Sequence, residues 1–297
     1  MWRAAAACGV MLAACGGAST SSTTAHTTVA GSEALTVKPL QYRDDIVANR
    51  VQLQVTNGLS RQLPLASVQL LWSGMNSELA ESDAVIGPGQ RVDLPVGLGP
   101  PSCRIDGTAV GASPDTDAAT VVFTLTDGST EVAAVLDPDG TLGGLHADAC
   151  EREMIGQQVS LEFADFSLRS IDGRDVTVAV LRMRRLAAPG DVEVQSSGNT
   201  IPFNLLIGEG NATPLLALPA AATEVEVPVQ FLEARCDAHA VAEAKQPFRF
   251  VMQVSLGGEP PRPYVVEPPP AMHSQMLATA AAGCAVLGED GSLSSEG

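Results

Sequence analysis

A pattern of alternating residues followed by a cysteine occurs twice in this chain and constrains its fold more than any other feature. Residues 92–96 alternate apolar side chains with polar or proline side chains and precede Cys103, and residues 225–229 repeat the pattern before Cys236. A second cysteine follows each copy, and the cysteines of the two copies are offset by 133 to 134 residues: Cys150 and Cys284. The repeat predicts one β-module that is used twice.

Alternation of apolar and polar side chains predicts short β-strands in both halves of the chain. Val51, Leu53 and Val55 alternate with polar residues and are followed by the turn signal Asn57-Gly58. Further strands are predicted in the same way at Val68, Leu70 and Trp72, at Val121, Phe123 and Leu125, at Leu161 and Phe163, at Val176, Val178 and Val180, and at Phe250, Met252 and Val254. No long amphipathic helix is apparent. The sequence therefore predicts an all-β fold with two tandem immunoglobulin-like antiparallel β-sandwiches.

Two local signals add detail to this prediction. Pro95 and Pro228 lack a backbone N–H donor, so each repeated strand is expected at a sheet edge or at a bulge. Residues 237–245 are expected to form a short helix with Asp237 as its N-cap.

Composition divides the chain into five parts. The stretch before residue 33 is rich in Ser, Thr, Gly and Ala, a composition that cannot pack a core. We expect a signal peptide, a flexible linker, a first β-sandwich module, a second module and a disordered acidic tail, with these bounds: 1–14, 15–32, 33–155, 156–288 and 289–297.

The N-terminal residues resemble a bacterial lipoprotein precursor. Arg3 precedes an apolar run that is too short to span a bilayer, and the run ends in Leu12-Ala13-Ala14-Cys15, which matches the lipobox pattern. The resemblance implies that Cys15 is diacylated on its sulfur, becomes the first mature residue and anchors the protein to the extracytoplasmic face of the cell membrane. The alternative is an ordinary secretory signal peptide.

Four cysteines remain after export and lipidation, and four cysteines permit three pairings. The repeat favours Cys103–Cys150 with Cys236–Cys284 as structural disulfides of a protein that matures outside the cytoplasm. The alternative is a metal or redox site near Cys236, where His239 and Glu243 would share one face of a short helix. This alternative is weaker, because the first half has no matching histidine and the chain has no CxxC or HExxH motif.

The spacing Cys-Asp-x-His-x-x-x-Glu-x-Lys at residues 236–245 is similar to runs in lipoproteins of high-GC Gram-positive bacteria, and this resemblance implies no activity.

The formal charge of −17 with only two lysines, Lys38 and Lys245, argues against nucleic acid as a partner. Five arginines form the one local excess of positive charge: Arg169, Arg174, Arg182, Arg184 and Arg185. They would bind an anionic polymer or an acidic face of the other module, or else lie on a solvated strand edge, which is the favoured interpretation. Solvated positions are also expected for His146, His273 and the pair Asp44-Asp45.

The sequence contains no GxSxG, SxxK or glycine-rich phosphate loop, so we expect neither an enzyme nor a bound cofactor. We expect instead a binding or scaffold role in the cell envelope, with an envelope protein or polymer as partner. Two alternatives stay open. One is an extracytoplasmic metal-handling protein or enzyme centred on Asp237, His239 and Glu243, and the other is a structural spacer.

Overall fold

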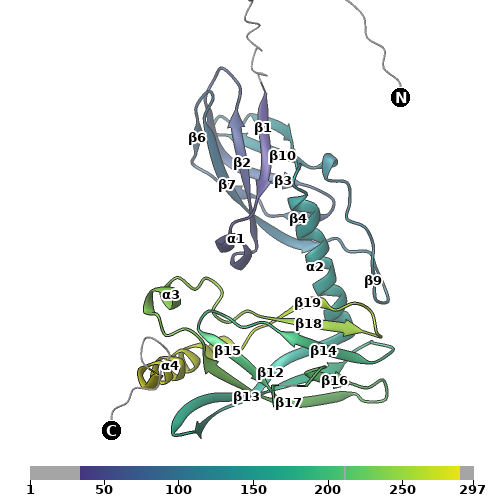
Figure 1. Cartoon of the computed structure of the whole chain (residues 1–297). Helices are drawn as coiled ribbons and strands as arrows, with labels where there is room; N and C mark the ends of the chain where they lie inside the picture. Colours follow the sequence, from purple (N-terminus) through teal and green to yellow (C-terminus); the bar gives the residue numbers. More distant parts are fainter. Residues whose placement is uncertain (1–33, 211, 288–297) are drawn as a thin grey trace, which may run out of the picture. The chain divides into compact units, whose positions relative to one another are not determined.

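The computed structural model describes residues 34–210 and 212–287 (Figure 1). The expected signal peptide, linker and tail, together with Cys15, lie outside the described residues. Within them the chain is mainly β-structure in several antiparallel sheets, so the coarse fold class is as predicted.

The first half contains two larger antiparallel sheets and the two-stranded antiparallel sheet formed by residues 105–106 and 109–110. The first has the order β1-β2-β7-β4, with bounds β1 (Leu35–Leu40), β2 (Arg50–Asn57), β7 (Arg91–Pro101) and β4 (Met75–Ser77). The second has the order β11-β10-β3-β5, with β6 also paired to β3: β11 (Thr130–Ala134), β10 (Thr120–Leu125), β3 (Leu63–Leu71), β5 (Ala80–Glu81) and β6 (Val85–Ile86). Four short elements complete this half: α1 (Arg43–Val47), β8 (Ile105–Asp106), β9 (Ala109–Val110) and η1 (Thr116–Ala118).

The second half also contains two antiparallel sheets. One has the order β12-β13-β17-β15, with bounds β12 (Val159–Ile171), β13 (Arg174–Arg185), β17 (Glu224–Glu233) and β15 (Phe203–Ile207). The other has the order β16-β14-β18-β19: β16 (Leu216–Leu218), β14 (Val192–Ser197), β18 (Phe250–Leu256) and β19 (Arg262–Val266). The short helix α3 (Ala238–Ala242) follows β17.

The strand orders of the two halves correspond strand for strand. The sheet β1-β2-β7-β4 matches β12-β13-β17-β15, and β11-β10-β3-β5 matches β19-β18-β14-β16. The central pairings agree as well, because Leu53 lies opposite Leu94 in the first half and Leu181 lies opposite Val227 in the second. The repeat seen in the sequence is therefore also a repeat of topology.

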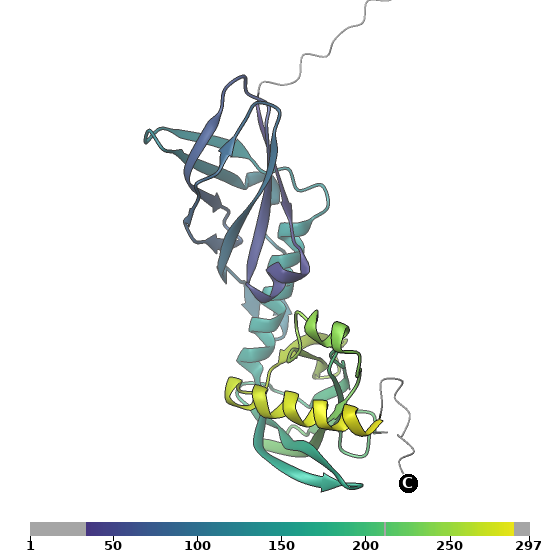
Figure 2. The same ribbon diagram turned by 90° about the vertical axis from the view of Figure 1, so that its left-hand side faces the viewer.

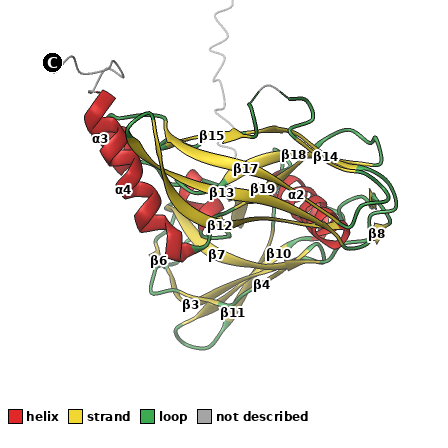
Figure 3. Cartoon of the chain, turned by 90° about the horizontal axis from the view of Figure 1, so that it is seen from below, coloured by secondary structure: helices red, strands yellow, loops and turns green. Residues whose placement is uncertain are grey.

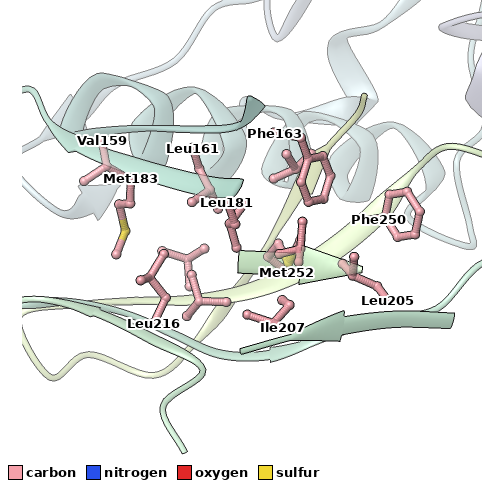
Figure 4. Packing of buried hydrophobic residues seen from close by; sticks show 14 of the residues in the cluster. Val159, Leu161, Phe163, Leu181, Met183, Leu205, Ile207, Leu216, Phe250 and Met252 are labelled. Atoms are coloured by element: carbon pink, nitrogen blue, oxygen red, sulfur yellow. The ribbon is translucent and has the colours of Figure 1, made fainter. Parts of the chain in front are cut away.

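Each half has its own hydrophobic core. In the first core the apolar residues of β2 pack with Phe123 of β10, and Val51, Leu53 and Val55 are fully buried as their alternation predicts. In the second core β12 and β13 face β18, as Figure 4 shows for Val159, Leu161, Phe163, Leu181, Met183, Phe250 and Met252. These alternating positions are buried because one face of each strand points away from water.

The predicted inward face of β13 is wrong for part of that strand. Val176 is buried, but Val178 and Val180 are only half-buried, and the core positions are Ala179, Leu181 and Met183. The paired strand β12 has a register shift between Ala164 and Ser167, opposite the same stretch of β13. β13 itself keeps a regular alternation, in which Ala179, Leu181 and Met183 face the core and Val178 and Val180 lie on the opposite face.

The two long helices of the structure were not predicted. The first, α2 (Thr141–Gln158), carries Leu142 and Ala149 in the first core, but Met154 and Ile155 in the second. The apolar side of α2 therefore changes along its length, and no single amphipathic stripe marks it in the sequence. The expected boundary between residues 155 and 156 falls inside this helix.

The second unpredicted helix is α4 (Pro270–Leu287), which contacts β13 and β17 (Figures 2 and 3). Met276 and Ala280 lie in the second core. Because α4 is rich in alanine on all sides, its sequence has little contrast between an apolar and a polar face. Among the described residues, no helix combines the length and apolar character needed to cross a membrane.

The repeated prolines do not lie on strands that form a sheet edge over their whole length. β7 lies between β2 and β4, and β17 lies between β13 and β15. However, the register of β4 covers only Leu98 to Pro101 of β7, so Pro95 lies before that pairing begins. Pro228 similarly lies at the end of the β15 pairing, where its carbonyl accepts a hydrogen bond from Gly208. Each proline is thus tolerated where its strand needs no second donor.

Candidate functional site

Both disulfides predicted from the repeat are present. Cys103 and Cys150 have Cα atoms 5.4 Å apart, and Cys236 and Cys284 have Cα atoms 5.1 Å apart. In each half the bond joins the segment after a central strand to a helix, α2 in the first half and α4 in the second. Two disulfides are typical of a protein that folds in an oxidising compartment, which favours an extracytoplasmic location.

The predicted helix after Cys236 is α3, and Asp237 is its N-cap. The Asp237 carboxylate accepts a hydrogen bond from the backbone N–H of His239 at 3.0 Å. His239 Nε2 lies 3.5 Å from Glu243 Oε1, but the two side chains are 80% and 68% exposed. Within the described part of the chain, no third His, Cys, Asp or Glu converges on this pair. The arrangement is an exposed pair at one turn of a helix.

A groove of about 430 Å³ begins where α3 ends. Its lining residues come mainly from the second half: 199–201, 243–246, Arg249 and Val251, together with Arg43 and Ile46 of α1. Three aliphatic side chains in this lining remain more than a third exposed: Ile46, Ile201 and Val251. Exposed aliphatic side chains grouped in a concavity are a feature of binding surfaces.

The charge of the groove is opposite to that of the protein as a whole. Arg43, Lys245 and Arg249 contribute three cations, and Glu243 contributes one carboxylate. Two of the cations have loose partners, because Lys245 Nζ lies 3.8 Å from an Asp44 carboxylate oxygen and Arg249 Nε lies 3.5 Å from Glu267. The side chains that line the groove therefore include more cations than carboxylates, while Asp44 and Glu267 beside the groove partly balance two of those cations.

The arginine excess predicted on β12 and β13 is not a free cationic surface. Arg182 pairs with Glu226 and with Asp165 at 2.8 Å, and Arg184 pairs with Glu224. Of the other arginines in the group, Arg174 pairs with Glu233, Arg185 donates to backbone carbonyls, and Arg169 is exposed. These ion pairs favour the interpretation of the arginines as a solvated strand edge over the binding of an anionic polymer.

Asp45 was predicted to be solvated, but the structure buries it. Its carboxylate accepts hydrogen bonds from Arg50, from Gln52 at 2.7 Å and from the backbone N–H of Tyr42 at 3.0 Å. Burial raises the pKa of Asp45, but these hydrogen bonds outweigh burial and leave the pKa below its usual value. The carboxylate thereby holds α1 against β2.

The prediction for His146 is also wrong, because this side chain is only 2% exposed. It lies beside the first disulfide, with Nε2 3.4 Å from Cys150 Sγ, and it packs edge-on against Trp72. Cys103, His146 and Cys150 are the one group of three potential metal-ligand side chains that converge within residues 34–210 and 212–287. His273 is half-buried, and its ring stacks on Phe248 at 3.6 Å.

A scan against protein-family models and a search of curated proteins found no match to this chain. Two local arrangements are candidate functional features of the described residues. One is the cationic groove beside α3, of whose lining the sequence singles out Glu243 and Lys245, just after the helix ends. The other is the histidine beside the first disulfide, whose partners are too distant in the sequence to be recognised from it.

Proposed function

We propose that this protein is a lipid-anchored, extracytoplasmic binding protein of the bacterial cell envelope, with two tandem immunoglobulin-like sandwiches. Its groove beside α3 binds an acidic, aliphatic peptide segment of an envelope partner. The observation that carries the proposal is the grouping of Lys245 and Arg249 with Ile201 and Val251 in one concavity of a strongly acidic chain.

The charges of the groove favour an anionic partner. Lys245 is 57% exposed, and its nearest carboxylate, on Asp44, lies 3.8 Å away and is also more than half exposed. Such a surface pair contributes little stability, on the order of 0–1 kcal/mol, so a ligand carboxylate can replace it at small cost. Because the whole chain carries a formal charge of −17, this cation acts on a ligand carboxylate only at short range, within a Debye length of about 8–10 Å.

The apolar side chains favour a peptide over a carbohydrate. The groove presents Ile46, Ile201 and Val251, and among its described lining residues none is aromatic. Sugar rings are usually bound by stacking on aromatic rings, whereas aliphatic side chains pack with Leu, Ile or Val of a peptide. The combination therefore fits a short segment with one or two carboxylates and a branched aliphatic residue.

The membrane attachment follows from the lipobox resemblance at Cys15. The residues that follow, 16–31, are rich in Gly, Ser, Thr and Ala, a composition typical of tethers. Labelling with a palmitate analogue and Cys15→Ser test this part separately. The label is expected on the full chain, and the variant is expected to lose the label and leave the membrane fraction. A variant that stays labelled would refute the anchor without affecting the groove.

A photo-crosslinking experiment tests the groove. A benzophenone amino acid replaces Ile201, or replaces Val132 as a control, which is 62% exposed and lies in the first half. In intact cells, position 201 is expected to give a protease-sensitive adduct that position 132 does not give. Mass spectrometry of the adduct is expected to identify an acidic segment of an envelope protein. No adduct at position 201, or a protease-resistant adduct, would overturn the proposed partner class.

Charge reversal then tests the cations. The double variant Lys245→Glu with Arg249→Glu is expected to reduce the position-201 adduct at least tenfold. The double variant Arg91→Glu with Arg169→Glu changes the net charge by the same amount at exposed sites outside the groove, and it is expected to leave the adduct unchanged. Equal losses in both variants would mean that total charge, and not the groove, determines binding. Circular dichroism confirms that each variant folds.

A further inference from the structure

The imidazole ring of His146 contacts the first disulfide. The two residues His146 and Cys150 lie one turn apart on α2, and the distance from Nε2 to Cys150 Sγ is 3.4 Å. His146 is 2% exposed and Cys150 is fully buried. The sulfur and the ring nitrogen therefore meet in an environment from which water is largely excluded.

The remaining partners hold the ring in place. His146 Nδ1 lies 3.0 Å from the Ser113 hydroxyl oxygen, and Nε2 lies 3.3 Å from the Ser102 carbonyl oxygen. Trp72 contacts the ring edge-on, with centroids 5.7 Å apart. The ring thus keeps Nε2 beside the Cys150 sulfur. In the disulfide this sulfur carries no proton, so it cannot donate to the imidazole and is only a weak acceptor for it.

Reduction of the disulfide would change the hydrogen bond between His146 Nε2 and the Cys150 sulfur. A thiolate at Cys150 would be a strong acceptor for an N–H of protonated His146 at the distance already present, and a histidine beside a cysteine is known to favour the thiolate form. A sulfur that is stabilised as a thiolate is also a better leaving group in thiol–disulfide exchange. The contact therefore favours cleavage of the bond in one direction, with Cys150 as the leaving sulfur.

We propose that Cys103–Cys150 is a redox-active disulfide, reduced by an extracytoplasmic dithiol protein, with His146 stabilising the Cys150 thiolate. A thiolate of the reductant attacks Cys103 Sγ, the Cys103–Cys150 bond breaks, and its electron pair goes to Cys150 Sγ. The second thiol of the reductant then attacks the reductant's own sulfur in the mixed disulfide, and Cys103 leaves as a thiol. The reductant leaves as a disulfide, two electrons and two protons pass to this protein, and the His146–Cys150 pair holds one of these protons.

The position of the attack follows from exposure. Cys103 is partly exposed, in the segment after β7, whereas Cys150 is fully buried in α2. An incoming thiolate therefore reaches Cys103 first. This order leaves the departing electron pair on the sulfur that contacts His146.

The second disulfide provides an internal control. Cys284 lies on α4 as Cys150 lies on α2, but the residue four positions earlier is Ala280, so no imidazole contacts the bond from that turn. Cys236 and Cys284 are both partly exposed. If exposure alone governed reduction, Cys236–Cys284 would react first. The proposal predicts the opposite order.

Reduction would have a structural consequence, because the bond ties the segment after β7 to α2. That helix places Leu142 in the first core and Ile155 in the second. A redox change at Cys150 is therefore positioned to alter how α2 is held, while Cys236–Cys284 keeps its own half closed.

The test is a timed reduction of the full-length protein with dithiothreitol at pH 7, with alkylation and peptide mass spectrometry of all four cysteines. Cys103–Cys150 is expected to open about tenfold faster than Cys236–Cys284. In His146→Gln, which keeps a polar side chain but cannot be protonated, this advantage is expected to disappear while the Cys236–Cys284 rate stays the same. Equal or slower opening of Cys103–Cys150 in the unmodified protein, or an unchanged rate in the variant, would overturn the proposal.

A second measurement needs no variant. With limiting glutathione as the thiol, the trapped mixed disulfide is expected on Cys103 and not on Cys150. Glutathione found mainly on Cys150, or found only on Cys236 and Cys284, would show that His146 does not direct the exchange.

Discussion

The guanidinium of Arg185 donates a hydrogen bond to the carbonyl oxygen of Gly190 at 2.7 Å. The same side chain also donates to four other backbone carbonyls in neighbouring loops, those of Ala188, Leu218, Pro219 and Ala222. Arg185 is the last residue of β13, so it holds together the loops at that end of the second half. A guanidinium has five N–H donors in a rigid fork, and lysine has three donors on a flexible stem.

Arg185→Lys is therefore expected to lower the free energy of unfolding by about 2 kcal/mol, because at least two carbonyls lose their donor. Urea denaturation monitored by circular dichroism measures the change. The neighbour Arg184 is exposed and pairs with Glu224, so Arg184→Lys should change stability by less than about 0.5 kcal/mol. Similar losses in the two variants would contradict a special role for Arg185.

Asp45 makes stability depend on pH. The hydrogen bonds from Arg50, Gln52 and Tyr42 lower its pKa in the folded state, so the stabilisation is present above the unfolded pKa of about 3.9 and is lost as pH falls through the folded pKa. Asp45→Asn is expected to cost about 1–3 kcal/mol at pH 7, and this difference should shrink below about pH 4. Denaturant midpoints measured from pH 3 to pH 7 check the profile.

The exposed neighbour Asp44 serves as the control for that profile, since its carboxylate makes only a 3.8 Å contact with Lys245. Asp44→Asn should change stability by less than about 0.5 kcal/mol at any of these pH values. A pH-independent loss in Asp45→Asn would mean that shape, and not charge, explains the effect.

Two threonine hydroxyls join α4 to the sheet. Thr177 Oγ1 of β13 lies 2.9 Å from Thr279 Oγ1 of α4, and Thr279 also donates to the carbonyl of Met276 in its own helix. Because the single hydroxyl proton of Thr279 is used in the bond to its own helix, the fully buried Thr177 is the donor of the pair. Thr279→Val leaves that donor without its acceptor and should cost about 1–3 kcal/mol, whereas Thr177→Val removes the donor and should cost about 1 kcal/mol.

The double variant separates the pair from its surroundings. Since both polar groups are gone in Thr177→Val with Thr279→Val, its loss should not exceed that of Thr279→Val alone. Thermal unfolding of the four proteins measures the coupling. Additive losses would show that the two hydroxyls do not depend on one another.

Features encoded by neighbouring residues could be predicted from the sequence. The strand at Val51, Leu53 and Val55 follows from a local alternation, and α3 follows from Asp237 as an N-cap. The disulfide pairing followed from the repeat, which compares the chain with itself and so carries information over long separations.

Features that depend on distant contacts could not be predicted. The apolar residues of α2 serve two cores, so no periodic signal marks the helix. His146 is buried by Trp72 and Ser113, which lie 74 and 33 residues earlier, and its sequence neighbours give no sign of that burial. The groove is a further example, because the fold brings Lys245 and Arg249 beside residues 199–201, which are more than 40 residues away in the sequence.

The two ends of α2 provide a test of whether the cores are independent. Leu142 and Ile155 are both fully buried, the first in the core of the first half and the second in the core of the second. Leu142→Ala and Ile155→Ala should each cost about 2–5 kcal/mol, because each leaves a cavity that its own core closes only in part. A cavity weakens mainly the contacts of the residues that line it.

Hydrogen exchange is therefore expected to rise in different places in the two variants. Leu142→Ala should raise exchange in β1 and leave β19 protected, whereas Ile155→Ala should raise exchange in β19 and leave β1 protected, because α2 contacts these two strands. Mass spectrometry of peptides from the two strands measures both. If either variant raised exchange equally in β1 and β19, α2 would couple the halves into one cooperative unit, and its apolar residues could not be assigned to separate cores.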